Sequence, residues 1–213
     1  MRLQPLAFVV FLGALAGPVR ADVTLVGVGT IPGDASDLSG LKGETSDGTP
    51  RNRLGGLGSA IAYTGTGNGY LLASDRGPKD GDTDFVCRWH TMDIRVAPGA
   101  RVPVALKLTA TTLLKTENGN PFVGSLGAFE HKKPERNLRL DPEGVRLGRN
   151  GNVFLADEYG PVVYEFDAKG KRVASLPVPA HFQAPKPGKS PADELPPKGS
   201  AGRQPNRGME GLA

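Results

Sequence analysis

The chain has 213 residues, a length that allows one large domain or two small ones. Its formal net charge is only +4, and it contains no arginine-rich helix or basic stripe with interleaved aromatic residues, so the sequence argues against nucleic acid as a partner. The 30 glycines and 19 prolines indicate many short elements joined by tight turns and exclude a protein built mainly from long helices.

Residues 1–21 have the features of a secretory signal peptide. Arg2 is basic, an apolar run covers residues 6–15, and Val19 and Ala21 stand three residues and one residue before the expected cleavage point. We predict cleavage after Ala21 and a periplasmic or secreted mature protein, with a retained anchor as the alternative. The apolar run is shorter than the roughly 20 residues that span a bilayer, so no stable membrane span is expected after cleavage.

The rest of the chain, residues 22–213, is predicted to be all-β. Short apolar or alternating runs bounded by turn residues predict two sets of four antiparallel strands. The first set is expected at 58–64, 69–75, 85–96 and 104–116, and the second at 143–149, 152–158, 162–168 and 172–178. An additional strand is expected at 22–31, and a Pro-, Lys- and Gly-rich loop at 182–205.

The two sets of strands are repeats of each other. Residues 70–78 match residues 153–161 without a gap, and both segments end in Gly-Pro. The start of the second set, at 143–145, recurs in residues 206–213. Repeated four-stranded sheets with a glycine-marked start are typical of a β-propeller. We therefore expect an incomplete propeller over residues 22–213, with two blades and the first strand of a third, from the N-terminal part of a longer protein.

Carboxylates flank matching strands of both sets. The second strand of each set ends in an acidic residue, and acidic residues precede the first strand of the second and third repeats. Because neighbouring strands are antiparallel, these ends lie side by side, and the acids are expected to converge at the mouth of the propeller channel. Their repulsion favours binding of a cation, and oxygen ligands suit calcium or magnesium. The candidate metal ligands are Asp75, Asp141, Glu143, Asp157, Glu158 and Glu210.

Two arginines accompany these acids in the sequence. Arg76 follows Asp75, and Arg207 precedes Glu210 by three residues. A cation flanked by guanidinium groups would bind a phosphate well, because each guanidinium can bind two phosphate oxygens. Two structural alternatives remain open at this point: the acids cap turns, or they form Asp–Arg bridges between blades. The single cysteine, Cys87, excludes a disulfide within the chain and is expected to be buried and inert.

The motifs "SDRGP", "DPEG", "EYGP" and "NRGMEGLA" together resemble the phytase-like family, also described as "esterase-like activity of phytase", of exported bacterial β-propellers. The resemblance runs from Arg53 to Ala213. It implies a calcium-assisted hydrolase of small phosphoester or ester substrates when the propeller is complete, with the present chain inactive by itself. The catalytic candidates are Asp75, Arg76, Glu143, Glu158, Arg207 and Glu210. A non-catalytic ligand- or protein-binding propeller and a lactonase-type ester hydrolase are the competing interpretations.

Overall fold

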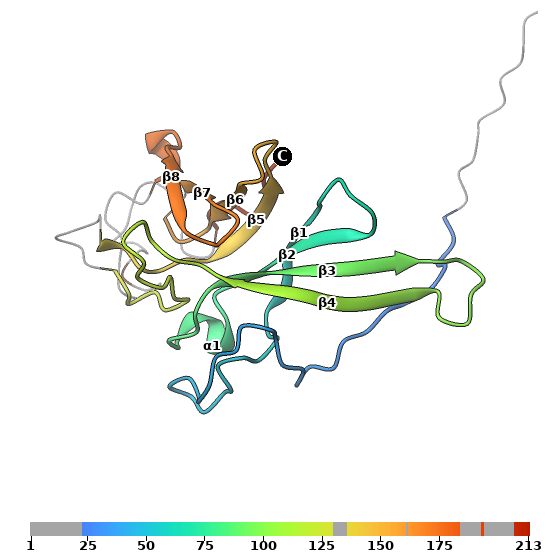
Figure 1. The fold of residues 1–213 in the computed structure, drawn as a ribbon. Coiled ribbons are helices and arrows are strands. Elements are labelled where there is room, and N and C mark those ends of the chain that lie inside the picture. Colours follow the sequence, from blue (N-terminus) through green and yellow to red (C-terminus); the bar gives the residue numbers. More distant parts are fainter. Residues whose placement is uncertain (1–22, 130–135, 161, 184–192, 194–206) are drawn as a thin grey trace, which may run out of the picture.

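The computed structural model describes residues 23–129, 136–160, 162–183, 193 and 207–213 (Figure 1). Within them the chain forms two four-stranded antiparallel sheets, each with its strands in sequence order. The first sheet contains β1 (Leu57–Tyr63), β2 (Gly69–Ser74), β3 (Arg88–Val96) and β4 (Val104–Leu113). The second contains β5 (Pro142–Leu147), β6 (Val153–Asp157), β7 (Val162–Phe166) and β8 (Arg172–Leu176). The all-β prediction is confirmed, and the two sheets are consistent with incomplete propeller blades.

Helical structure is almost absent from the described residues. Its two named elements are the four-residue α1 (Pro78–Gly81) and a 3-10 turn at Ala180–Phe182. No helix in this part of the chain is long and apolar enough to cross a membrane. The predicted signal peptide and nearly all of the predicted 182–205 loop lie outside the described residues.

The turns of the second sheet have the geometry that the sequence predicts. Gly151 adopts φ 82°, a backbone conformation that glycine accepts without strain, and Asn150 accepts a hydrogen bond from the amide of Asn152 at 3.1 Å. Gly170 adopts φ 77° in the turn between β7 and β8. These short turns fix the register of the neighbouring strands and therefore decide which residues share an end of the sheet.

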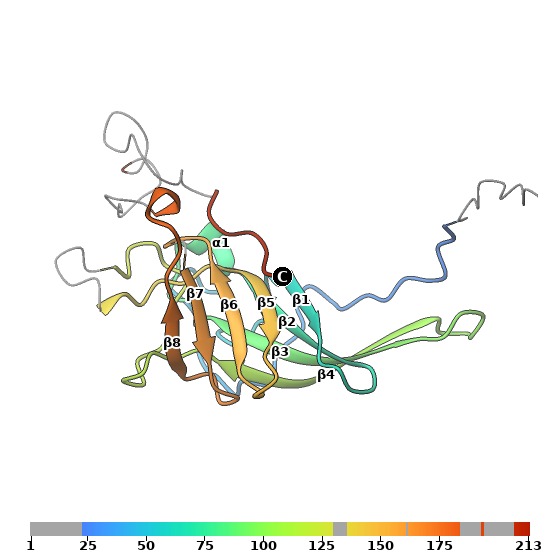
Figure 2. The ribbon, with the colours of Figure 1, turned by 90° about the horizontal axis from the view of Figure 1, so that it is seen from above.

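The hydrophobic core joins the two sheets. Trp89 of the first sheet contacts Phe166 of the second edge-on, with ring centroids 6.1 Å apart, and Phe122 from the connecting segment contacts Phe166 at 5.9 Å. Cys87 is fully buried in the same core and is a free thiol, as predicted. Strand β5 contacts both β1 and β2, so the first strands of the two sheets are neighbours (Figure 2). This contact brings the ends of β2, β5 and β6 together.

Two strand predictions at the ends of the chain are wrong. Residues 23–31 are extended but form no strand, because no described segment pairs with their backbone; Gly27 and Gly29 instead lie close to Pro103 and Val104. Residues 207–213 also form no strand, although they lie beside β5, where a Cβ on Gly144 would be 2.9 Å from the amide nitrogen of Leu212. A strand needs a hydrogen-bonded partner, which the sequence pattern alone does not supply.

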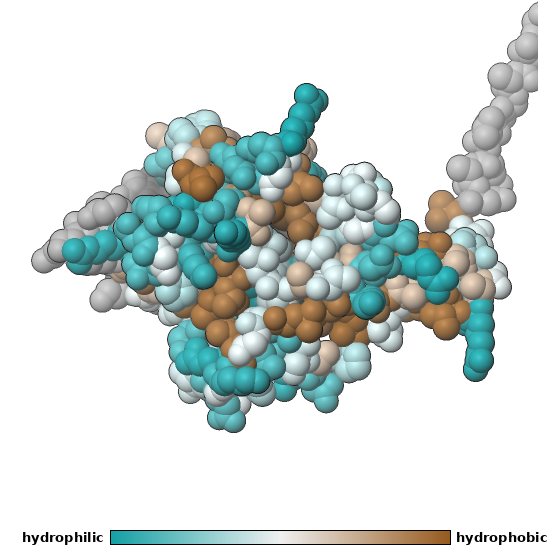
Figure 3. Space-filling model, in the orientation of Figure 1, coloured by the Kyte–Doolittle hydropathy of each residue, from teal (hydrophilic) through white to brown (hydrophobic). Residues whose placement is uncertain are grey.

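Hydrophobic side chains remain exposed along the β3–β4 hairpin. Val96 at the end of β3 and Val102 in the turn are 54% and 53% exposed, and Val28 in the extended N-terminal segment is 68% exposed. Figure 3 shows brown patches among teal and white ones along this hairpin. The core between the sheets therefore buries only part of the apolar side chains of this fold.

Candidate functional site

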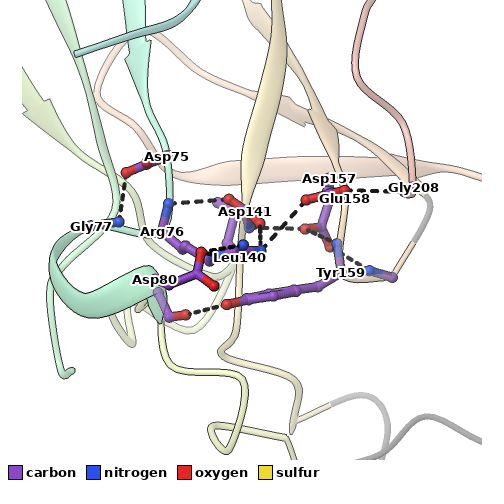
Figure 4. Close-up of polar contacts among 12 residues, drawn as sticks. Asp75, Arg76, Gly77, Asp80, Leu140, Asp141, Asp157, Glu158, Tyr159 and Gly208 are labelled. Carbon is purple, nitrogen blue, oxygen red and sulfur yellow. Dashed lines mark hydrogen bonds and ion pairs between the residues drawn. The ribbon is translucent and has the colours of Figure 1, made fainter. Parts of the chain in front are cut away.

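Three carboxylates meet where the two sheets contact each other. Pairing of β5 with β6 places Pro142 opposite Asp157, so Asp141 and Glu158, which flank this pair, emerge at the same end of the second sheet. One oxygen from each of Asp141, Glu143 and Glu158 lies within 4.8 Å of the others. We call these three residues the acid cluster; Figure 4 labels two of them, Asp141 and Glu158. The predicted convergence of acids is therefore observed for these residues.

Arg76, which follows β2, connects the first sheet to the acid cluster. Its Nη1 donates to Asp141 Oδ2 at 2.5 Å and to Glu158 Oε2 at 3.5 Å, and its backbone amide donates to Asp141 Oδ1 at 3.1 Å. The other side of the guanidinium donates to Asp80, with Nε 2.9 Å from Oδ1. The ring centroid of Tyr159 lies 5.4 Å from the guanidinium carbon (Figure 4). An Asp–Arg bridge between blades, one of the two structural alternatives, is thus present.

Burial and mutual repulsion make the acid cluster hard to ionise. Burial raises the pKa of Asp141 to about 7 despite the nearby charge of Arg76. Burial, followed by the charge of Glu158, raises the pKa of Glu143 to about 7, and burial also raises the pKa of Glu158. Fully ionised, the three carboxylates and one guanidinium carry a net charge of −2. A divalent cation would neutralise that charge.

The donor set fits a hard cation. All three groups offer carboxylate oxygens, and neither histidine nor cysteine belongs to the cluster, which favours calcium or magnesium over zinc. Asp141 and Glu158 are buried, whereas Glu143 is half-buried and open to solvent on one side. A cation could therefore enter from the side of Glu143.

Asp75 and Glu210 lie near the acid cluster but outside the group of three. Both charges contribute to the raised pKa of Glu143. Asp75 Oδ1 accepts a hydrogen bond from the amide of Gly77 at 2.7 Å, a contact within its own turn. Arg207 is exposed, and none of the ion pairs between described residues includes it. Its predicted role stays a prediction.

Asp157 has a different environment from the acids around it. Its side chain is fully buried, and Oδ1 accepts hydrogen bonds from the amides of Asp141 at 3.0 Å and Tyr159 at 3.2 Å. Oδ2 accepts a third hydrogen bond, from the amide of Gly160 at 3.2 Å. The structure therefore places Asp157 as a brace that joins the start of β5 to the end of β6. Its predicted role as a metal ligand has no support in this geometry.

Comparison with known proteins agrees with the resemblance in the motifs. Residues 52–213 match the family model named phytase-like, described as "esterase-like activity of phytase". The chain belongs to the phytase-like family. One relative, an uncharacterized secreted protein of Arthroderma benhamiae, is 28% identical over an alignment 242 residues long that includes 88% of this chain and 45% of the relative. The phytase-like chain thus spans less than half the length of that relative, and no solved structure matches it.

Sequence reasoning on this phytase-like chain missed Asp80 and Tyr159. Both contact the guanidinium of Arg76, one as its ion-pair partner and the other through its ring. The available signal was the spacing of Asp80, four residues after Arg76 in a short "GPKDG" turn. Lys79 and Asp80 adopt φ 53° and 58°, a left-handed conformation that non-glycine residues rarely adopt and that a sequence pattern does not predict.

The close packing of Gly124 against Arg76 and Tyr159 positions two residues of this phytase-like site, and a substitution at Gly124 tests that packing. A Cβ on Gly124 would overlap the carbonyl oxygen of Arg76, and the Gly124 carbonyl accepts a hydrogen bond from Tyr159 Oη at 2.8 Å. We expect Gly124→Ala to lower the free energy of unfolding by about 1–3 kcal/mol in urea titrations. Gly33→Ala is the matched control, since no atom lies within 4 Å of a Cβ there. Equal stability of the two variants would contradict this account of the packing.

Proposed function

We propose that this phytase-like domain hydrolyses phosphoesters with the help of a divalent cation, calcium in the first instance, bound by Asp141, Glu143 and Glu158. The observation that carries the proposal is the approach of three carboxylate oxygens to within 4.8 Å, a concentration of negative charge that the single positive charge of Arg76 does not balance. The family description, esterase-like activity of phytase, supports an ester as the substrate. Because the chain covers 45% of its secreted relative, the proposal concerns the activity of the whole protein.

The residues of the chain take distinct roles in this proposal. A cation bound here would polarise a phosphoryl oxygen and lower the pKa of a bound water. Arg76 would bind the phosphate dianion beside it through its planar guanidinium. A carboxylate oxygen of Glu143 or Glu158 that is not bound to the cation would accept the proton of the attacking water.

The remaining candidates lie at the rim of the site. Asp75 and Glu210 add negative charge around Glu143 and thereby raise cation affinity. Arg207 is exposed on the segment that follows the predicted loop, where it could contact the leaving group of an anionic substrate. Asp157 would support the site only indirectly, through the backbone amides of Asp141 and Tyr159.

We also propose that the protein is exported through the signal peptide at residues 1–21. The relative from Arthroderma benhamiae is named a secreted protein, which supports this part of the proposal. Mass spectrometry of protein recovered outside the cytoplasm should give a mature N-terminus at Asp22. A mass that includes Met1 would instead favour a retained anchor.

Cation binding is the direct test on this chain. We expect calorimetric titration of the chelator-treated chain with CaCl2 to give one saturable binding event, and Glu143→Gln to weaken it by about tenfold or more, because a ligand charge is lost. Glu44→Gln is the matched control, since Glu44 is exposed on a loop before the first sheet. An unchanged isotherm for Glu143→Gln, or no binding of calcium or magnesium by the parent chain, would contradict the proposed centre.

Activity is tested with a small panel of substrates. p-Nitrophenyl phosphate, phytate and an aliphatic lactone would be offered to this chain and to the longer secreted relative, each with calcium and with chelator. Phosphoester hydrolysis that chelator abolishes supports the proposal. Hydrolysis of the lactone alone would identify a lactonase-type enzyme, and calcium binding without any turnover would identify a binding propeller.

A further inference from the structure

The guanidinium of Arg76 binds two of the carboxylates that a cation in the acid cluster would need. Its Nη1 is the donor to both Asp141 Oδ2 and Glu158 Oε2, two of the three carboxylates within reach of one ion. An arginine and a divalent cation repel each other, and both cannot use the same oxygens at close range. The geometry therefore makes Arg76 a competitor of any bound cation as well as a neighbour of it.

We propose that Arg76 is an internal competing cation that sets the affinity of the acid cluster for calcium, and that Asp80, already bound to the other side of the guanidinium, becomes its remaining acidic partner when calcium displaces Nη1. This inference rests on the proposed function, because it assumes that the acid cluster binds a cation. It adds a role for Asp80, which lies outside the acid cluster and is 82% exposed. It also gives Arg76 two states, one with the cluster unloaded and one with it loaded.

The structure already contains the contacts of the second state. Nε and Nη2 of Arg76 both donate to Asp80 Oδ1, on the side of the guanidinium that faces away from the acid cluster. Asp80 is held there by a left-handed turn at Lys79 and Asp80, with φ 53° and 58°. Such a conformation is energetically unfavourable for these residue types and persists where surrounding contacts impose it. The ion pair with Arg76 is one of those contacts.

Displacement of Nη1 would have a consequence for substrate binding. Calcium at Asp141 and Glu158 would free Nη1 to bind an anion at the edge of the cluster, while Asp80 retains the opposite side of the guanidinium. Calcium and an oxyanion would then increase each other's affinity, and this coupling must be equal in both directions. An anionic substrate would therefore bind more tightly to the calcium-loaded chain than to the calcium-free chain.

Calcium titrations of two variants test the competition. We expect Arg76→Met to bind calcium about tenfold or more tightly than the parent chain, because it removes a competing positive charge from the same oxygens. Asp80→Asn should do the opposite and weaken calcium binding about fivefold or more, because the displaced guanidinium loses its partner. Asp80 is exposed, so its variant is expected to fold even if Arg76→Met does not.

Asp82→Asn controls for the loss of one negative charge near the site. Asp82 is exposed, two residues from Asp80, and has no ion pair among the described residues. Its replacement should change calcium affinity by less than about twofold, because exposed charges are screened by salt. A decrease as large as that of Asp80→Asn would show a general charge effect and overturn the role of Asp80.

A second titration measures the coupling to an anion. The probe is sulfate, a tetrahedral dianion whose calcium salt is much more soluble than calcium phosphate, used at concentrations below its precipitation with calcium. Sulfate should bind the parent chain about fivefold or more tightly with calcium than with chelator, and Arg76→Met should lose this difference. Equal sulfate affinity in both conditions for the parent chain would overturn the inference.

The failure of this inference can be separated from failure of the proposed function. Calcium binding by the parent chain with unchanged or weaker binding by Arg76→Met would leave the metal centre intact and overturn the competition. No calcium binding by either protein would remove the metal centre itself and the inference with it. Binding by Arg76→Met alone would support the competition and show that Arg76 excludes calcium from the parent chain.

Discussion

Asp157→Ala is expected to lower the free energy of unfolding by about 3 kcal/mol or more, since it leaves buried backbone amides without acceptors. The carboxylate of Asp157 accepts three backbone hydrogen bonds, from the amides of Asp141, Tyr159 and Gly160. Two of these bonds are fully buried, so water cannot replace the lost acceptor. Urea unfolding monitored by the fluorescence of Trp89 would measure the loss.

A graded variant separates bracing from metal binding at this position. Asp157→Asn keeps one carbonyl oxygen and should lose less stability than Asp157→Ala, with calcium affinity within a few-fold of the parent chain. The sequence-based prediction of Asp157 as a ligand gives the reverse result. It requires a large loss of calcium affinity in Asp157→Asn at nearly unchanged stability, and that outcome would overturn the bracing role.

The second large effect is in the pH dependence of stability. We expect the chelator-treated chain to lose stability as the pH rises from about 4 to about 7.5, and calcium to restore that stability at the upper end. The folded-state pKa values of Asp141 and Glu143 are raised to about 7 and that of Asp157 to about 6, in each case first by burial. Their values in the unfolded chain are near 4.

The sign follows from proton binding. Between pH 4 and pH 7 the folded chain keeps protons on these carboxyls that the unfolded chain has lost, so raising the pH favours unfolding. The loss amounts to at most about 1.4 kcal/mol per pH unit for each carboxyl. Calcium binds the ionised carboxylates, so its stabilising effect should increase over the same pH range.

His90 changes the unfolding free energy with pH in the opposite direction, and its effect must be separated from that of the carboxyls. Its ring is fully buried between Ser74 and Thr111, and burial lowers its pKa to about 4. Below pH 6.5 the unfolded chain gains a proton that the folded chain does not, so His90 destabilises the fold as the pH falls. The useful quantity is therefore the difference in unfolding free energy with and without calcium, from which the contribution of His90 cancels.

Urea titrations from pH 4.5 to pH 8 would give this difference. It should be near zero at pH 4.5, where protons occupy the acid cluster, and largest at pH 8. Glu143→Gln should flatten the curve. A calcium effect that is independent of pH would contradict ion binding to carboxyls with raised pKa values.

Much of the fold could be predicted because it is encoded locally. Alternating apolar residues and turn pairs such as Asn150-Gly151 set the strands, and their repetition sets the number of sheets. Once the strands are known to be antiparallel neighbours, Asp141 and Glu158 must lie at one end of a sheet. Residues 23–31 have the local pattern of a strand but form none, because no described segment pairs with their backbone.

The contacts that each acidic side chain makes could not be predicted from local sequence patterns. Glu158 and Asp157 are adjacent and come from one motif, yet one joins the acid cluster and the other accepts hydrogen bonds from backbone amides. Arg76 follows Asp75 in the chain, but its ion pairs are with Asp80 and with Asp141 and Glu158, 65 and 82 residues away. Chain proximity does not determine side-chain direction, because strand pleat, turn conformation and the packing of one sheet on another all contribute to it.

The sequence by itself determined the antiparallel sheets, their repetition and the end of the sheets at which the acids collect, because those features depend on local patterns and on strand direction. Only the tertiary structure decided which acids lie within reach of one another, which one braces the backbone, and that Arg76 from the first sheet enters the cluster of the second. Those outcomes depend on distances of a few ångströms between segments far apart in the chain, and sheet packing sets these distances.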